Sequence, residues 1–436
     1  MNTLVSFAGI ASIRVLTAVS QLIIIAAASQ VFSKDEFGRF AISYALVRLL
    51  QAGSGLGAQS YLLKDIPYRQ VHGRAWHSYR SATWFFLIAP FLICVLAGVL
   101  FESIGALEWS VYPLQSGQGA SVATFAFLWT IQVTLASYVR TLRSSTEAML
   151  LKELAAPAAL LVTMMAGWLM IGEVSIVGLF LGSSLLLLAG ELTMFGWHLY
   201  KKWIPVGGGG AEAVPFKELK AYWGTVRLNT MTSQFDIVLA GIVLSPAAVG
   251  LYTIIKRITS VMLLAVSIVV WMYAPKISRA SAAADLDALT RFARRAMQFT
   301  LVPATIVCVV LLVALPWWTA YFEIATDSTF WIVFSLMLSG QVLSVCMGST
   351  MMFATQTGQP MLMVSSLSRA VLIVAPLILI AGSIIGIVGV AAMQLVMIFL
   401  MKWPVRRSLL VEQGLDVSLT TLLRGAPSSS HSQIKE

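Results

Sequence analysis

Long apolar stretches recur along the whole chain, about one every thirty residues, and they limit its fold more than any other feature. Each stretch holds roughly 18 to 28 mostly apolar residues, enough for a helix to cross about 30 Å of hydrocarbon. Twelve can be marked, at 4–31, 40–63, 81–104, 119–139, 154–172, 176–199, 221–244, 250–273, 296–319, 329–353, 361–384 and 386–402. This pattern predicts an all-α polytopic membrane protein with about twelve transmembrane helices.

The composition agrees with a membrane protein and excludes a large soluble domain. Of the 436 residues, 58% are hydrophobic and 11% are charged, whereas a soluble domain has about 25% charged residues. The first apolar stretch is too long for the apolar region of a signal peptide, so we interpret it as the first span. Cys94, Cys308 and Cys346 lie inside apolar stretches, and we expect neither a disulfide nor a metal or cofactor site.

The basic residues predict the orientation of the chain. Cytoplasmic connections of membrane proteins carry an excess of Lys and Arg, which accounts for the net charge of +10 without nucleic-acid binding. Alternate connections and the tail hold most of the basic residues, whereas the opposite side holds only Lys34 and Arg39. Both termini are therefore expected in the cytoplasm. The basic residues on the predicted cytoplasmic side are Lys64, Arg69, Arg74, Arg80, Arg140, Arg143, Lys152, Lys201, Lys202, Lys217, Lys220, Lys276, Arg279, Arg291, Arg294, Arg295, Lys402, Arg406, Arg407, Arg424 and Lys435.

Two pairs of similar segments indicate an internal repeat. "SIRVLTAVSQ" (12–21) matches "TVRLNTMTSQ" (225–234) 213 positions later, with Arg14 opposite Arg227. "EFGRF" (36–40) matches "AVGLY" (248–252) at an offset of 212. The matching spans share one orientation, so the repeat is a parallel one, related by an axis along the membrane normal.

The repeat and the loop composition predict the domain organisation. Four consecutive glycines, 207–210, fall in the connection that divides the spans six and six, and such a sequence is typical of a flexible linker. We predict a six-helix lobe at 1–200, a cytoplasmic linker at 201–220, a second six-helix lobe at 221–402 and a polar tail at 403–436. Two pseudo-symmetric bundles around a central cavity follow from this division.

Six basic residues lie within the predicted spans. An arginine at a helix centre costs about 2.5 to 3.5 kcal/mol when it faces lipid, so most of the six are expected to face water or an anion. Arg14, Arg48 and Arg369 lie deepest, whereas the other three are near enough to the surfaces for their head groups to reach lipid headgroups. The set is Arg14, Arg48, Arg227, Lys256, Arg257 and Arg369.

Two acidic residues, Asp236 and Glu191, accompany these cations away from the ends of the spans. We interpret both as counter-ions or coupling residues, and any basic partner of Asp236 must come from another span. The excess of positive charge suits an anionic substrate, and the planar guanidinium fork suits phosphate best. A substrate with a diphosphate group would find there the charge compensation that the bilayer lacks.

These features resemble the polysaccharide-transport branch of the multidrug/oligosaccharidyl-lipid/polysaccharide exporter superfamily, which includes the O-antigen flippases. The resemblance covers nearly the whole chain and rests on the twelve spans, the loop "FSKDEFG" (32–38), and the arginine of "YALVRLL" (44–50) before "GSGLG" (53–57). It is a resemblance of pattern, because no short signature marks this branch.

Membership of that branch implies an inverted-V transporter of the bacterial inner membrane. Its substrate would be a polyprenyl-diphosphate-linked oligosaccharide, moved from the cytoplasmic to the outer leaflet during polysaccharide biosynthesis. Basic residues would line the cavity, and a polysaccharide polymerase and glycosyltransferases would be partners. No cofactor is implied.

Two other functions remain open at this point. The first is a cation-coupled multidrug or metabolite exporter of the same superfamily, which needs ion-binding acids in the spans. The second is a membrane glycosyltransferase or polymerase, which needs a sizeable outer loop, and the predicted outer connections are short. The chain has no GxxxxGK[ST] motif, so it does not drive transport with ATP through a P-loop.

Overall fold

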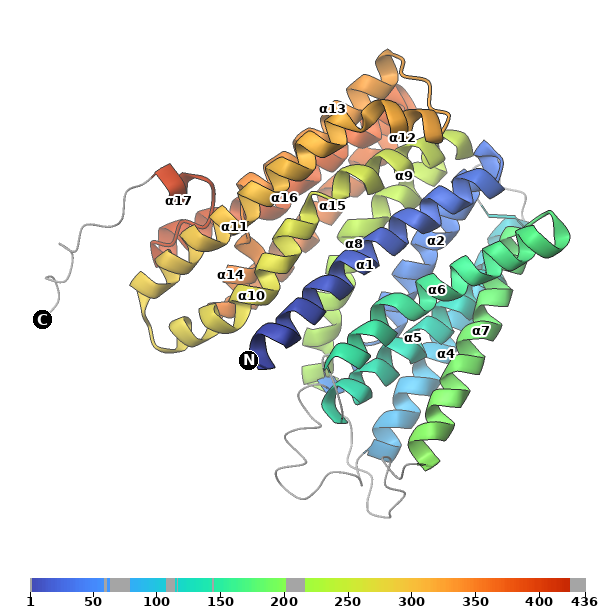
Figure 1. The fold of residues 1–436 in the computed structure, drawn as a ribbon, viewed down its shortest axis with the longest axis horizontal. Coiled ribbons are helices and arrows are strands. Elements are labelled where there is room, and N and C mark those ends of the chain that lie inside the picture. The colour runs from blue at the N-terminus through green and yellow to red at the C-terminus, as the bar shows by residue number, and fades with distance from the viewer. Residues whose placement is uncertain are drawn as a thin grey trace, which may run out of the picture. The chain divides into compact units, whose positions relative to one another are not determined.

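In the residues that it describes, the computed structural model consists almost entirely of helices (Figure 1). It describes residues 2–58, 61–62, 79–106, 114–115, 117–142, 145–200 and 216–423. No strand occurs among these residues. The chain forms two compact units, Met1–Thr253 and Ile254–Glu436, and each is described by itself. The division into lobes at 1–200 and 221–402 stays a prediction, as do the linker at 201–220, of which 201–215 lie outside the described residues, and the cytoplasmic tail from 403.

The described residues of unit 1 form seven long helices and the beginning of another. The capping box of Ser33 and Glu36 fixes the start of α2, because the Ser33 amide donates to Glu36 Oε2 at 3.1 Å and the Glu36 amide donates to Ser33 Oγ at 3.4 Å. The helices are α1 (Asn2–Val31), α2 (Lys34–Ser54), α4 (Tyr79–Ala106), α5 (Gln118–Leu142), α6 (Ser145–Ile171), α7 (Ile176–Tyr200), α8 (Phe216–Val243) and the first turns of α9 (Pro246–Ser260).

The centre of unit 1 is α5, which packs against α2, α4, α6 and α7 (Figure 1). A buried helix with polar residues needs partners for their hydroxyl groups. Thr130, Thr134 and Ser137 satisfy theirs by donating to the carbonyl oxygen four residues earlier, at 2.8 to 3.0 Å. The polar row of α5 is therefore buried without unpaired hydroxyl groups at these three positions.

The segments of the second sequence match meet in unit 1. A Cβ added to Gly38 in α2 would lie 1.7 Å from the carbonyl oxygen of Pro246, the first residue of α9. A Cβ added to Gly250 would lie 2.8 Å from the Phe37 ring. Asp35 Oδ1 accepts a hydrogen bond from the Ala247 amide at 3.2 Å. The two matching glycines thus allow the starts of α2 and α9 to touch.

Unit 2 contains the rest of the chain. Asp285 and Asp327 cap α11 and α13 by accepting hydrogen bonds from the amides of Ala288 (2.7 Å) and Phe330 (2.8 Å). The helices after α9 are α10 (Leu263–Ala282), α11 (Leu286–Val313), α12 (Leu315–Tyr321), α13 (Ser328–Cys346), α14 (Thr350–Gln356), α15 (Pro360–Ile385), α16 (Ile387–Gln413) and α17 (Thr420–Leu423).

The helices confirm the all-α polytopic fold, and they follow the twelve predicted stretches one by one. Within the described residues, eight helices are long and apolar enough to cross a membrane, or nine if the pair α9 and α10, bent by 50°, counts as one span. The remaining predicted spans correspond to α1, α2 and α8, with 30, 21 and 28 residues. About twelve membrane helices are therefore consistent with the structure.

The eighth and tenth spans are interrupted where the sequence predicts continuous helices. The eighth breaks between α9 and α10, and the tenth breaks between α13 and α14, where Gly348 has φ 66°. A Cβ at Gly348 would lie 2.0 Å from the Val417 carbonyl oxygen. The second break therefore accommodates the C-terminal segment, residues 415–423.

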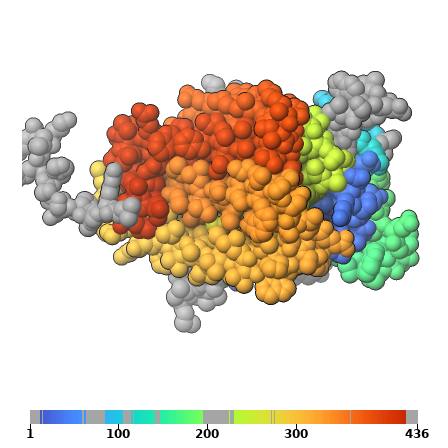
Figure 2. Space-filling model, turned by 90° about the horizontal axis from the view of Figure 1, so that it is seen from above, coloured from blue at the N-terminus to red at the C-terminus, as the bar shows by residue number. Residues whose placement is uncertain are grey.

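The C-terminal segment folds back onto unit 2 after α16. Leu415 and Val417 are buried in a core with residues of α10, α11, α14 and α16, and the Leu419 amide donates to the Cys346 carbonyl oxygen at 2.8 Å. Figure 2 shows the red C-terminal part of unit 2 next to its yellow and orange helices. The ordered chain thus continues beyond the predicted last span at 386–402.

Candidate functional site

Arg48 is the deep basic residue whose surroundings the structure describes best. It is half-buried on α2, and its guanidinium carbon lies 4.8 Å from the centre of the Trp129 ring on α5. Trp129 is only 1% exposed, and its ring lies 6.2 Å from that of Tyr44, one turn before Arg48. A cation over a ring interacts with the ring face, and the five N–H donors of a guanidinium suit the oxygen atoms of an anion.

A group of hydroxyls lies one to two turns further along α2. The hydroxyl oxygens of Ser54 and Thr130 are 2.9 Å apart, and Thr130 Oγ1 also lies 3.4 Å from the Gln51 carbonyl oxygen. Ser54 and Thr130 are buried. The second half of α2 therefore presents a cation and fixed polar groups against the same helix, α5.

Asp236 is fully buried on α8 and is bound by a side chain that the sequence analysis missed. The Tyr252 hydroxyl group donates to Asp236 Oδ2 at 2.6 Å, and both side chains are 0% exposed. The sequence signal was present, since Tyr252 is the last residue of the repeat segment "AVGLY". The bond connects α8 to the start of α9 within unit 1.

Glu191 on α7 is buried, with 9% of its surface exposed. Its Oε1 atom has no hydrogen-bond partner among the described residues. Its role as a counter-ion or coupling residue stays a prediction, and the structure adds that this carboxyl group is enclosed in unit 1.

The other candidate cations are distributed over both units. Arg14 and Arg227 lie on α1 and α8, but their side chains are outside the described part of the structure. In unit 2, Lys256 is 8% exposed, Arg257 is half-buried and Arg369 is exposed on α15. The convergence of these residues with Arg48 on one cavity stays a prediction.

Three basic residues that the sequence analysis placed on the cytoplasmic side after the last span, Lys402, Arg406 and Arg407, lie within α16. Lys402 Nζ donates to the carbonyl oxygens of Ser344 (2.7 Å) and Gly348 (3.2 Å), at the break between α13 and α14. Ser344 belongs to the last turn of α13, where backbone acceptors lack partners within the helix, and Gly348 lies in the turn that follows. Lys402 therefore supports the broken span.

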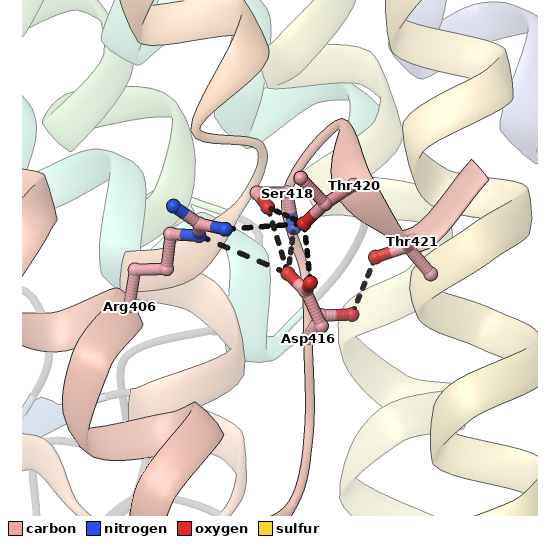
Figure 3. Close-up of polar contacts among 5 residues, drawn as sticks. All are labelled: Arg406, Asp416, Ser418, Thr420 and Thr421. Carbon is pink, nitrogen blue, oxygen red and sulfur yellow. Dashed lines mark hydrogen bonds and ion pairs between the residues drawn. The ribbon is translucent and has the colours of Figure 1, made fainter. Parts of the chain in front are cut away.

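Arg406 holds the C-terminal segment (Figure 3). Its Nε lies 3.8 Å from Asp416 Oδ1, and its Nη2 donates to Thr420 Oγ1 at 3.1 Å. Asp416 also accepts hydrogen bonds from the Ser418 amide (3.1 Å), the Ser418 hydroxyl group (2.7 Å) and the Thr420 hydroxyl group. Burial raises the pKa of the Asp416 carboxyl group, but these hydrogen bonds and the Arg406 charge together hold it below 3.8.

Comparison with solved structures identifies the fold. No family model matches the chain, and no curated protein matches its sequence. An inward-facing multidrug resistance MATE family transporter of the MOP superfamily superposes with a TM-score of 0.67 at 13% identity, covering 93% of this chain and 99% of that one. The lipid II flippase MurJ in an inward closed conformation gives a TM-score of 0.60 at 14% identity, covering 95% and 91%.

A further similar structure is the MATE multidrug transporter DinF-BH in complex with a ligand. It has a TM-score of 0.61 and 12% identity, and the match covers 96% of this chain and 95% of that one. These similarities confirm, at the level of the fold, the resemblance that the sequence indicated. The chain has the fold of the MATE and MurJ transporters of the MOP superfamily.

Proposed function

We propose that this protein is a flippase that moves a polyprenyl-diphosphate-linked oligosaccharide from the cytoplasmic to the outer leaflet of the bacterial inner membrane. In this proposal the two lobes work by alternating access, and the substrate serves O-antigen, capsule or exopolysaccharide synthesis. Support comes from the fold, since one solved protein that shares it is named as a lipid II flippase.

The observation that carries the proposal is Arg48 stacked on Trp129 inside unit 1. A cation at this depth is costly when it faces lipid. The position over a buried ring limits where the guanidinium group can lie, and such a group can form two parallel hydrogen bonds to a phosphate group. Arg48, together with Arg14, would bind the diphosphate in the N-terminal lobe. Arg227, Arg369, Lys256 and Arg257 would contribute further positive charge, the last three from unit 2.

The membrane potential favours the proposed direction of transport. With the inside negative, each negative charge that moves outward gains about 2.3 kcal/mol per 100 mV. The gain applies because the arginines stay on the protein while the diphosphate crosses.

A cation-coupled exporter is the second candidate, and Glu191 is the observation that favours it. Its Oε1 atom is buried without a hydrogen-bond partner among the described residues. Because an ionisable group inside a membrane costs free energy to insert, such a residue is a candidate for a functional role. Asp236 supports this alternative less, because it is engaged by Tyr252. Export of a cationic dye that is lost in Glu191→Gln would support the exporter.

The proposal is tested by complementation in a strain that lacks the protein. Surface display of the polymer should be restored by the wild type and by Arg407→Gln, an exposed basic residue of α16. Arg48→Gln and Arg14→Gln should restore it poorly. Full restoration by both of these variants would overturn the assignment of the substrate site.

A further inference from the structure

We propose that the α10–α11 hairpin binds the headgroup of an acidic phospholipid of the cytoplasmic leaflet through Lys276, Arg291 and Arg295. The inference is independent of the transported substrate, because it concerns the outer surface of unit 2. It rests on three observations: an exposed apolar stripe, the position of the arginines at its end, and a buried tyrosine beside the cations.

One face of the second half of α11 is exposed and apolar. Its members recur at intervals of three and four residues, so they form a single stripe along the helix. They are Phe299 (54% exposed), Val302 (61%), Ile306 (58%), Val309 (54%) and Val313 (62%). In a helix long and apolar enough to cross the membrane, such a stripe faces the acyl chains.

Arg291 and Arg295 continue the same face before the stripe begins, two turns and one turn ahead of Phe299, and both are exposed. Arg295 lies 18 residues before Val313, which is about 27 Å along a helix. The hydrocarbon core is about 30 Å thick. Trp317, 69% exposed, follows the far end of the stripe, where aromatic residues mark the opposite interface. Arg295 therefore lies at the level of the lipid headgroups.

Tyr273 brings a third cation from α10 to this place. Its ring lies 6.1 Å from Phe292 and 6.3 Å from Phe299, the aromatic residues on either side of Arg295 in α11. Lys276 Nζ lies 5.3 Å from the centre of the same ring. Since Tyr273 is only 4% exposed, it is a fixed support that places Lys276 beside the turn of Arg295.

The charge of these residues is not neutralised within the described part of unit 2. Neither Arg291 nor Arg295 forms an ion pair there. Asp285, an acidic residue at the turn of the hairpin, accepts a hydrogen bond from the Ala288 amide as the cap of α11. An acidic phospholipid supplies what the site lacks, because its phosphate group lies at the level of the cations while its chains lie along Phe299 and Val302. The cytoplasmic leaflet is the one enriched in anionic lipids, and the basic residues predict that this end of the hairpin is cytoplasmic.

The test measures lipid binding to the purified full chain by native mass spectrometry, with phosphatidylglycerol and phosphatidylcholine as probes. The wild type should bind phosphatidylglycerol more tightly than phosphatidylcholine. Arg291→Gln together with Arg295→Gln should weaken that binding about thirtyfold, since each cation near the surface contributes about a factor of five. Arg407→Gln, at an exposed cation of α16, should leave it unchanged. Equal binding by the double variant and the wild type would overturn the proposal, as would equal affinity for the two lipids.

A second arm distinguishes bulk lipid from a polyprenyl diphosphate. If the double variant loses polyprenyl diphosphate binding but keeps phosphatidylglycerol binding, the site belongs to a transport substrate and the proposal is wrong. Should the double variant fail to fold, Lys276→Gln carries the test, with phosphatidylglycerol binding about fivefold weaker. Loss of flippase activity in any assay does not bear on this result, because binding is read directly.

Discussion

At the residue scale, three buried or half-buried ionisable side chains contact uncharged groups. Arg48 stacks on Trp129, Asp236 accepts the Tyr252 hydroxyl group, and Lys402 binds two backbone carbonyls. In a low-dielectric interior a polar group that loses its partner keeps its full desolvation cost. The neighbours are therefore as informative about these sites as the charged residues themselves.

Tyr252→Phe should destabilise the protein although it removes only one oxygen atom. The Asp236 carboxyl group would stay buried but lose its 2.6 Å hydrogen bond, and removing a hydrogen-bond partner from a buried group costs about 1 to 3 kcal/mol. Thermal unfolding of the purified protein measures the effect. Tyr321→Phe, at a tyrosine that is 50% exposed, is the matched control, and equal midpoints for the two variants would contradict the prediction.

Asp416 should make stability depend on pH in the acid range. Its pKa is lower in the folded protein than the ordinary value of 3.8, so the unfolded chain binds the proton more readily. The contribution to stability is then fully present above about pH 4 and is lost as the pH falls through the lowered pKa. Unfolding midpoints recorded from about pH 5 to pH 3 should fall less steeply for Asp416→Asn than for the wild type. If Asp416→Asn retains the wild-type slope, the Arg406–Asp416 contact does not hold the segment.

At the element scale, the contact between α2 and α9 depends on the absence of a side chain at Gly38. The carbonyl oxygen of Pro246 occupies the space that a Cβ would need, and backbone atoms move less readily than side chains. This contact also joins the two segments that the second sequence match pairs. The parallel repeat itself stays a prediction.

Gly38→Ala should therefore lower stability, by about 1 to 3 kcal/mol as expected for overpacking. Gly53→Ala is the control in the same helix, because nothing lies within 4 Å of a Cβ added there and alanine favours a helix by up to about 1 kcal/mol over glycine. The thermal unfolding midpoints of the two variants measure the difference in stability. A Gly38→Ala protein as stable as Gly53→Ala would show that α2 and α9 are not in close contact.

At the scale of the whole molecule, helix positions were predictable because hydrocarbon thickness sets a length that the sequence must satisfy. Even the division of the last apolar region was correct, since Gly386, with φ 65°, separates α15 from α16. The break after α13 was not predictable, because it depends on the distant Val417 carbonyl and on Lys402. The predicted last helix ended at residue 402, because charged residues follow there. In the structure α16 continues to Gln413, and one of those charged residues, Arg406, pairs with Asp416.

The candidate site was predictable only in part. Charge in an apolar stretch identified Arg48 and Asp236 as unusual, but hydropathy gives no information on which ring or hydroxyl group faces them. Trp129 and Tyr252 were therefore missed. For Arg369, the position deep in the predicted span did not reveal that its side chain is exposed on α15.

Transbilayer movement of a fluorescent polyprenyl-diphosphate oligosaccharide in proteoliposomes tests the central claim most directly. The wild type should accelerate it, and Arg48→Gln should reduce the initial rate at least tenfold, since a charge-assisted contact to phosphate contributes about 1.5 to 3 kcal/mol. Arg407→Gln should move the lipid at the wild-type rate. Equal rates for the wild type and Arg48→Gln would contradict the claim that this arginine binds the diphosphate, and a wild-type rate equal to that of protein-free liposomes would contradict the flippase itself.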